Sequence, residues 1–276
     1  MSTPSEFATT ATAYFRDLQS RVCAAFESFE PVSRFEARSW MKPDAHQLRG
    51  GGESRLMRGA VFEKVGVNVS HVWGTLAPEA RGQVAGAQES DGRFNACGIS
   101  LVAHMANPYV PTVHMNLRYL STSRAWFGGG ADLTPTFPFS EDTEAFHAAL
   151  RGACESYRPD AYAQFKAWCD RYFYLPHRHE PRGVGGIFFD DLASADPNAD
   201  FAFVRAVGEA LLRLYPTIVA RRKDTIFDEA ARERQLIKRG RYVEFNLVYD
   251  RGTKFGFATD ADPDAYLMSL PPLVKW

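Results

Sequence analysis

The feature that most limits how this chain can fold is a strict alternation of apolar and polar residues between positions 111 and 120. The apolar positions are Val113, Met115, Leu117 and Tyr119, and the polar positions between them are His114, Asn116 and Arg118. Successive side chains of a β-strand point to opposite faces of the sheet. The alternation therefore predicts a strand with one apolar face and one face lined with hydrogen-bonding groups.

Two neighbouring segments have the same character. Residues 60–74 are rich in β-branched side chains, and residues 94–105 would place Ser100 and His104 on one face of a strand. Residues 107–111 join the segment 94–105 to the strand predicted at 111–120. They contain an asparagine and two prolines, which is a strong turn signal. A turn this short makes the strands before and after it antiparallel neighbours.

A fourth strand is expected at residues 241–250, where apolar and polar residues again alternate. Its polar face would carry Glu244, Asn246 and Asp250, opposite Val243, Phe245, Leu247 and Tyr249.

Helical periodicity surrounds these strands, at residues 6–29, 141–153, 160–174, 200–223 and 228–239. Asp160 is placed to cap the third helix, Pro216 should break or kink the fourth, and Gly240 should end the fifth. Helices before, between and after the strands would cover both faces of the sheet. We therefore expect an α+β fold, with a large, mostly antiparallel sheet between two helical layers, and a single domain over residues 1–276.

Three glycine-rich runs are expected to be loops or turns. Residues 34–58 contain RGGGESR, a flexible loop by composition, and the runs at 127–135 and 181–191 read as turns. Neither of the latter two fits a dinucleotide fingerprint, and the chain has no Walker-A sequence. Nucleotide binding is therefore not indicated.

Composition excludes several other classes of protein. The 276 residues carry 32 Lys and Arg against 33 Asp and Glu, which argues against nucleic acid as the main partner. No apolar stretch reaches the roughly 18 residues of a membrane span, and residues 1–7 resemble no targeting segment. The four cysteines are scattered, as expected for reduced, buried thiols. These features predict a cytoplasmic protein.

The polar strand faces leave two interpretations open. They either meet solvent, as is common in antiparallel sheets, or line a ligand cleft beneath the helices. Helical cover favours the cleft, because an unpaired buried polar group costs about 1–3 kcal/mol. The histidines are likewise ambiguous, since no spacing typical of a metal site joins them.

Four segments, taken in order, resemble the oxygen-dependent coproporphyrinogen III oxidase family. They are NPYVPTVHMNLR at 107–118, FGGGADLTP at 127–135, RGVGGIFFDDL at 182–192 and RGRYVEFNLVYDRGTKFG at 239–256. The similarity runs from about residue 34 to Trp276. It implies an enzyme that converts the ring A and B propionates of coproporphyrinogen III into vinyl groups in haem biosynthesis, with O2 as co-substrate and no organic cofactor. It also implies a homodimer, with residues 241–276 as the dimer-forming segment.

The resemblance also implies roles for individual residues. His114, Asp132 and Asp250 would be catalytic, with His114 the proton donor and Asp132 facing the pyrrole N–H groups. Substrate would be bound by Ser100, Asn116, Leu117, Arg118, Arg251, Asp260, Ala261 and Asp262. Here residues 259–262 read TDAD, whereas many relatives carry a glycine-rich stretch with a basic or polar residue. Two acids there would repel propionates.

The resemblance also implies a divalent metal. The resemblance proposes His104, His114, His147 and His177 as its ligands, and their spacing adds no support. Two other functions therefore stay open. One is a histidine–metal oxygenase or hydrolase, and the other is a tetrapyrrole-binding protein without catalysis.

Overall fold

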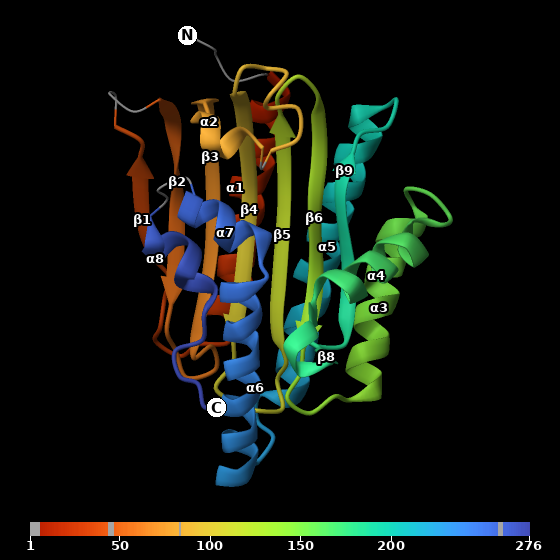
Figure 1. The fold of residues 1–276 in the computed structure, drawn as a ribbon. Coiled ribbons are helices and arrows are strands. Elements are labelled where there is room, and N and C mark those ends of the chain that lie inside the picture. The colour runs from red at the N-terminus through yellow and green to blue at the C-terminus, as the bar shows by residue number, and fades with distance from the viewer. Residues whose placement is uncertain (1–5, 44–46, 83, 259–261) are drawn as a thin grey trace.

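A computed structural model describes residues 6–43, 47–82, 84–258 and 262–276 (Figure 1). Within them, seven strands form one sheet in which every neighbouring pair is antiparallel. In spatial order they are β1 (Glu36–Met41), β2 (Leu48–Met57), β3 (Lys64–Thr75), β4 (Arg93–His104), β5 (Thr112–Ser121), β6 (Ala125–Thr134) and β9 (Gly185–Leu192). The expected α+β fold is confirmed.

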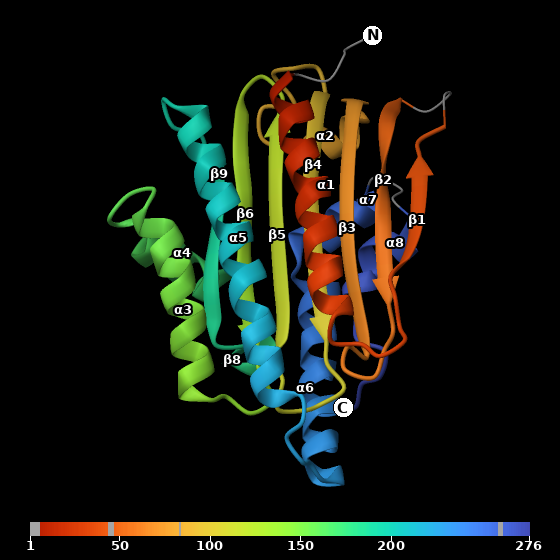
Figure 2. The ribbon, with the colours of Figure 1, turned by 180° about the vertical axis from the view of Figure 1, so that it is seen from behind.

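Helices cover both faces of the sheet, as Figures 1 and 2 show together. One face, here called the core face, packs against α1 (Glu6–Glu27) and α5 (Pro197–Arg222). The other, here called the site face, lies beneath α6 (Glu229–Val248), α7 (Arg251–Ala258), α8 (Pro263–Tyr266) and the short 3₁₀ helix η2 (Leu267–Ser269).

The remaining elements are short or lie beside β9. They are α2 (Pro78–Arg81), α3 (Ser140–Glu155), α4 (Ala161–Tyr172), the 3₁₀ turn η1 (Pro176–Arg178), and the small pair β7 (Tyr174–Leu175) and β8 (Glu180–Pro181). No helix in the described part of the chain is long and apolar enough to cross a membrane.

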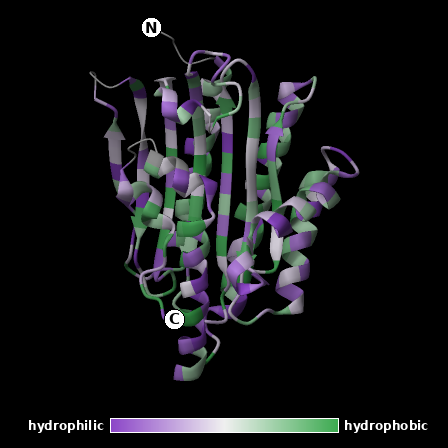
Figure 3. Cartoon of the chain, viewed as in Figure 1, coloured by the Kyte–Doolittle hydropathy of each residue, from purple (hydrophilic) through white to green (hydrophobic). Residues whose placement is uncertain are grey.

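The alternation in β5 divides its side chains between the two faces, and Figure 3 shows it as bands of opposite hydropathy. Val113, Met115 and Leu117 are fully buried on the core face, where α1 contributes Phe15 and Leu18 to the same cluster. A fully buried aliphatic side chain contributes about 1.5–3 kcal/mol to folding. The core therefore occupies one face and leaves the polar positions of β5 on the other.

The strand expected at 241–250 is wrong, because α6 continues through Gly240 to Val248. Its buried residues include Arg239, Tyr242 and Phe245, which follow a helical period rather than a period of two. Phe245 packs against Phe173 with ring centroids 5.3 Å apart. Tertiary packing therefore overrides a local pattern that also fits a strand.

The glycine-rich runs are also strands rather than loops or turns. The run at 49–55 lies in β2, the run at 127–135 forms most of β6, and the run at 181–191 contains all of β9 except Leu192. A Cβ on Gly52 would lie 2.7 Å from the Trp40 ring of the neighbouring strand. Glycine there permits the close approach of side chains across the sheet.

Two further helix predictions are confirmed only in part. Pro216 lies inside α5, which continues to Arg222. Proline in a helix interior costs about 3 kcal/mol, and the buried Tyr215, Ile218 and Val219 around it offset that cost. Asp160 does occupy the N-cap position of α4, but its side chain caps no backbone group and instead accepts a hydrogen bond from Gln164.

Candidate active site

The strand register brings the polar residues of three strands together on the site face. His114 lies opposite Asp132 of β6, and Asn116 lies opposite Ser100 of β4. Arg118 lies opposite Gly128. The sheet thus places an acid, an imidazole, an amide, a hydroxyl and a guanidinium within a few ångströms of the same surface.

A buried ion cluster forms the centre of this face. His114 Nδ1 lies 2.8 Å from Asp132 Oδ1, and Arg182 donates to both carboxylate oxygens, from Nη2 at 2.6 Å and from Nε at 3.2 Å. The side chains of Asp132 and Arg182 are 1% and 3% exposed, whereas that of His114 is 19% exposed. His114 is therefore the member of the cluster that remains accessible.

The charge of Asp132 is set by its two partners. Burial alone raises the pKa of a carboxyl group, but the Arg182 charge and the His114 hydrogen bond outweigh that effect and hold the pKa of Asp132 below its ordinary value. The carboxylate is thus ionised at neutral pH. An ionised carboxylate at Nδ1 favours the imidazole tautomer whose Nε2 can accept a proton.

Aromatic rings enclose the Arg182 side chain. Its guanidinium carbon lies 4.0, 4.6 and 4.8 Å from the ring centroids of Phe173, Tyr242 and Phe245. Nη1 donates to Asn246 Oδ1 at 3.2 Å. Burial lowers the pKa of an arginine, but Asp132 more than compensates and the pKa of Arg182 lies above its usual value. This packing fixes the guanidinium, and through it the carboxylate.

A cavity of about 330 Å³ opens beside Asp132. Its lining comes from α4, the segment around β8 and the start of β9, and includes Asp170, Phe173 and Gly183. A pocket of this size can take part of a drug-sized ligand.

A second charged cluster lies further along β5. Arg118 Nη1 donates to Asn116 Oδ1 at 2.9 Å, and its Nη2 lies 3.0 Å from Asp190 Oδ1. Asp190 Oδ2 lies 3.4 Å from Arg251 Nη1 of α7. A Cβ on Gly128 would lie 2.4 Å from Asp190 Oδ1, so glycine at this position makes room for the ion pair.

Comparison with known proteins identifies the family. A sequence profile described as coproporphyrinogen III oxidase matches residues 10–276. The chain is 50% identical over 274 residues to the oxygen-dependent coproporphyrinogen-III oxidase of Rickettsia conorii, covering 96% of each protein. It is 50% identical over 272 residues to the protein of the same name from Rickettsia akari, covering 95% of this chain and 96% of that one. The chain belongs to the coproporphyrinogen III oxidase family.

Only some of the residues expected to bind substrate lie close together in the structure. Four of them lie on or over the site face. Ser100 pairs with Asn116 in the strand register, and Asn116 bonds Arg118. Arg118 and Arg251 both contact Asp190. Leu117 is 0% exposed on the core face, so its side chain does not reach the site. Because successive side chains of a strand point to opposite faces, Leu117 faces away from Asn116 and Arg118.

The acidic segment before α8 has a structural role at its one described position. Asp262 caps α8 by accepting a hydrogen bond from the backbone of Asp264, and it lies 3.2 Å from Arg38. Its charge is thus compensated rather than aimed at propionates. Asp260 and Ala261 lie outside the described residues.

Asp250 is held at the junction of α6 and α7. It accepts hydrogen bonds from the Tyr172 hydroxyl at 3.0 Å and from the backbone N–H and hydroxyl of Thr253 at 2.7 and 3.0 Å. The sequence predicts a strand at this position, whereas the structure has the end of a helix. Asp250 still lies next to Arg251, which contacts Asp190 in the charged cluster of Arg118.

The four histidines considered as metal ligands do not converge. His104 bonds the backbone of Ser269, His114 bonds Asp132, His147 bonds Tyr162 and Val184, and His177 bonds Glu244 and Tyr249. Within the described ranges, no three His, Cys, Asp or Glu side chains are grouped as a metal site requires. These residues therefore do not fit the expected metal, and His104 is a buried structural histidine.

Sequence reasoning missed Arg182 and Asp190. Arg182 follows β8 in an irregular segment, so no periodicity marks it. Asp190 lies in a glycine-rich run for which the sequence predicts a turn. Both residues could have been identified as candidates because they belong to RGVGGIFFDDL, one of the four segments that carry the resemblance.

Proposed function

We propose that this protein is an oxidoreductase that converts coproporphyrinogen III and two O2 into protoporphyrinogen IX, two CO2 and two H2O2. In each half of the reaction one propionate loses its carboxyl group as CO2 and one hydrogen from its β-carbon, leaving a vinyl group. The two electrons released reduce one O2 to H2O2. The observation that carries this proposal is the buried Asp132–Arg182 pair holding an accessible His114 on the site face.

His114 is the proton-transfer group in this proposal. Its Nδ1 bonds Asp132, and its Nε2 bonds no other described residue. Nε2 can therefore accept the pyrrole N–H proton and return it later. Both oxygens of Asp132 already accept hydrogen bonds, so in this proposal Asp132 orients His114 instead of contacting the pyrrole N–H groups directly.

Removal of the pyrrole proton makes the ring electron-rich enough to add O2 at a ring carbon. The resulting peroxide takes the β-hydrogen as the carboxylate departs as CO2, and its bond to the ring carbon breaks. With one further proton from solvent it leaves as H2O2, and the side chain remains as the vinyl group. The substrate itself supplies the electrons, so we propose no organic cofactor. The four histidines have separate hydrogen-bond partners, so the proposed steps assign them no shared metal.

Arg118 is the proposed anchor for a propionate. Its side chain is 28% exposed, and its guanidinium is held by Asn116 and Asp190. Arginine offers a planar fork that binds a carboxylate through two parallel hydrogen bonds. Ser100 and Asn116 add neutral donors beside it, and Arg251 approaches from α7. In this arrangement the substrate is oriented before the chemistry begins.

The test is to incubate metal-stripped protein with coproporphyrinogen III in air. Product fluorescence after oxidation and O2 uptake are followed together. We expect turnover with two O2 consumed per substrate. Binding without O2 uptake would instead indicate a tetrapyrrole-binding protein, and turnover only after a divalent metal is restored would indicate a metal oxygenase.

We further propose that the chain works as one domain, in the cytoplasm, as a homodimer. All four cysteines are free and buried, which suits a reducing compartment. Strand β1 is an edge strand of the sheet, and most of its residues are exposed. Exposed apolar side chains, including Leu247, Val248 and Phe257, lie in the expected dimer-forming segment 241–276.

A further inference from the structure

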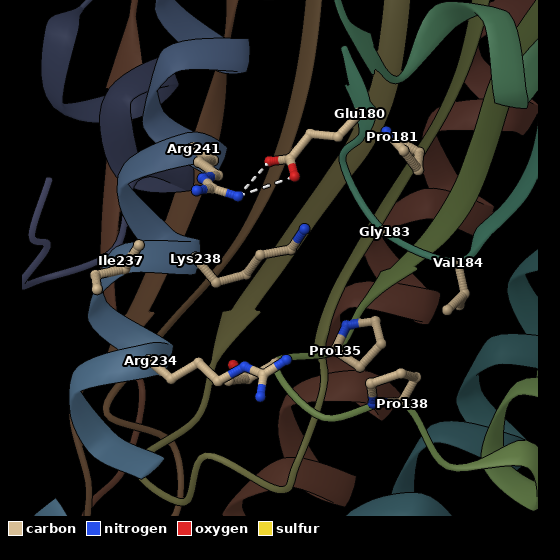
Figure 4. Close-up of a pocket in the computed structure, with 11 residues that line it drawn as sticks. Pro135, Pro138, Glu180, Pro181, Gly183, Val184, Arg234, Ile237, Lys238 and Arg241 are labelled. Carbon is tan, nitrogen blue, oxygen red and sulfur yellow. Dashed lines mark hydrogen bonds and ion pairs between the residues drawn. The ribbon is translucent and has the colours of Figure 1, made fainter. Parts of the chain in front are cut away.

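A second cavity, of about 450 Å³, lies between α6 and the segment that leads from β8 to β9 (Figure 4). It shares Pro181, Gly183 and Val184 with the cavity beside Asp132, but it does not contain Asp132. None of the residues given a role in the reaction lines it.

One wall of this cavity is basic. Arg234, Lys238 and Arg241 come from α6 at spacings of four and three residues, which places them on one face of the helix. Figure 4 shows Lys238 extending across the cavity towards Gly183, and Arg234 extending towards Pro135. A helix face that directs three cations into one cavity favours an anionic occupant.

Among the described residues, one of these three cations has an acidic partner. Arg241 Nη1 lies 2.8 and 2.9 Å from the two carboxylate oxygens of Glu180. Arg234 lies over the Phe137 ring, 4.8 Å from its centroid. Across the described ranges, neither Arg234 nor Lys238 forms an ion pair with a carboxylate. The cavity therefore presents two uncompensated positive charges.

Burial lowers the pKa of Lys238, and the charges of Arg241 and Arg234 act in the same direction against the opposing effect of Glu180. A bound carboxylate would relieve this repulsion and favour the charged amine.

The opposite wall is apolar. It consists of Pro135, Pro138, Pro181 and Val184, with Ile237 on α6 beside the cations. Inorganic phosphate would leave this wall uncovered. An organic acid would cover it with its carbon skeleton while its carboxylate meets the two cations.

We propose that this cavity binds an organic carboxylate with an apolar body, its carboxylate held between Arg234 and Lys238. Two sources share this chemistry, namely a free small acid and a propionate arm of a tetrapyrrole. The binding site itself does not depend on the proposed reaction, because it can be measured without turnover.

The probe is 3-phenylpropionate, titrated by ligand-observed NMR against the wild-type protein, Arg234→Gln and Lys238→Gln. Arg213→Gln is the matched control, because it removes one exposed charge from α5 on the core face. We expect each cavity variant to weaken binding about tenfold or more, as for loss of a charged hydrogen bond, and the control to leave it unchanged. The neutral amide of the probe should also bind about tenfold more weakly.

Equal binding to all four proteins, or no binding to the wild type, overturns the proposal. The source is then decided with coproporphyrinogen III. A raised KM in Lys238→Gln, with kcat unchanged, assigns the cavity to a propionate of the substrate. An unchanged KM together with lost probe binding assigns it to a free carboxylate. If the protein proves inactive on coproporphyrinogen III, the probe titration still decides whether the site exists.

Discussion

At the scale of single residues, the site depends on a carboxylate that is kept ionised although it is buried. Asp132 is charged because Arg182 and His114 together outweigh its loss of hydration. The same contacts leave the carboxylate no free oxygen. We therefore propose that its chemical effect is exerted through His114, whose ring reaches the surface of the site.

Two substitutions test this division of roles. His114→Gln keeps the Asp132–Arg182 pair and should lower kcat about 10²- to 10⁴-fold, the usual contribution of a proton-transfer group, with KM changed only a few-fold. Asp132→Asn should lower kcat similarly, but it should also reduce the free energy of unfolding by roughly 3–5 kcal/mol because it leaves Arg182 buried without a counter-charge. Steady-state kinetics and urea unfolding measure both effects.

Asp170→Asn serves as the control for these variants. Asp170 lines the cavity beside Asp132, and its ion pair is with Lys166 near the surface. It should leave kcat nearly unchanged. A His114→Gln variant with wild-type kcat would remove His114 from the mechanism.

His104 supports a prediction about stability and pH. Complete burial lowers its pKa to about 3, although the bond to the Ser269 carbonyl opposes the shift. In the unfolded chain the pKa of histidine is about 6.5, so the unfolded state binds a proton first as the pH falls. The stability gained from the neutral, buried ring is thus complete above about pH 6.5 and is lost as the pH falls towards 3, at up to about 1.4 kcal/mol per pH unit.

His104→Gln can keep a donor to the Ser269 carbonyl but cannot titrate. Its free energy of unfolding should therefore fall less steeply between pH 6.5 and 4 than that of the wild type, measured by urea unfolding. The control is His179→Asn, a change at an exposed histidine with positive φ, which asparagine tolerates. Parallel pH profiles for wild type and His104→Gln would contradict this account.

At the scale of elements, the sequence predicted those whose burial follows their own periodicity. Strand β5 has the apolar and polar faces expected from its alternation, and the expected helix 6–29 is α1 with a small change at its end. The prediction failed at 241–250, where aromatic and polar residues fit either period. Only contact with Phe173 and the rest of the fold selects the helix.

Gly240 shows why that helix could not be delimited from local signals. It was expected to end a helix, yet it lies inside α6, where a Cβ would lie 2.4 Å from the backbone oxygen of Lys275. The glycine permits the C-terminal segment to cross the helix closely. Such a contact joins residues 35 positions apart, so no local pattern reports it.

A matched pair of substitutions tests this reading. Glycine to alanine inside a helix normally stabilises by about 0.5–1 kcal/mol. Gly152→Ala in α3 should do so, because nothing lies within 4 Å of the added Cβ. Gly240→Ala should instead destabilise the protein, since the Cβ displaces the backbone at Lys275. Urea unfolding of both variants measures the difference, and equal stabilisation would show that the C-terminal contact is loose.

At the scale of the whole molecule, the site could be predicted only in part because it is assembled from distant segments. The alternation in β5 identified His114, Asn116 and Arg118 as sharing one face, and the resemblance added Asp132. Arg182 comes from an irregular segment and reaches Asp132 only when β9 pairs with β6. Its partner Asn246 comes from the C-terminal half of α6, where the local pattern predicts a strand. A contact network of this kind is a property of the complete fold.

The proposed homodimer is the prediction that belongs to the whole molecule. An edge strand exposes unpaired backbone groups that another chain can meet, and Met41 at the end of β1 is 74% exposed. Val248, at the end of α6, is 50% exposed in the segment expected to form the interface. Met41→Glu and Val248→Glu place a charge where a partner would bury it, which costs several kcal/mol per desolvated ion.

We expect both variants to raise the dimer dissociation constant at least about tenfold in sedimentation equilibrium. Ile226→Glu is the control, because Ile226 is 94% exposed in the connection between α5 and α6, outside the proposed surfaces. A wild-type protein that is monomeric at micromolar concentration, or an equal effect of Ile226→Glu, would contradict the proposed interface. If only Val248→Glu acts, the second copy contacts the C-terminal segment and the β1 edge stays free, so that edge would need another form of protection against aggregation.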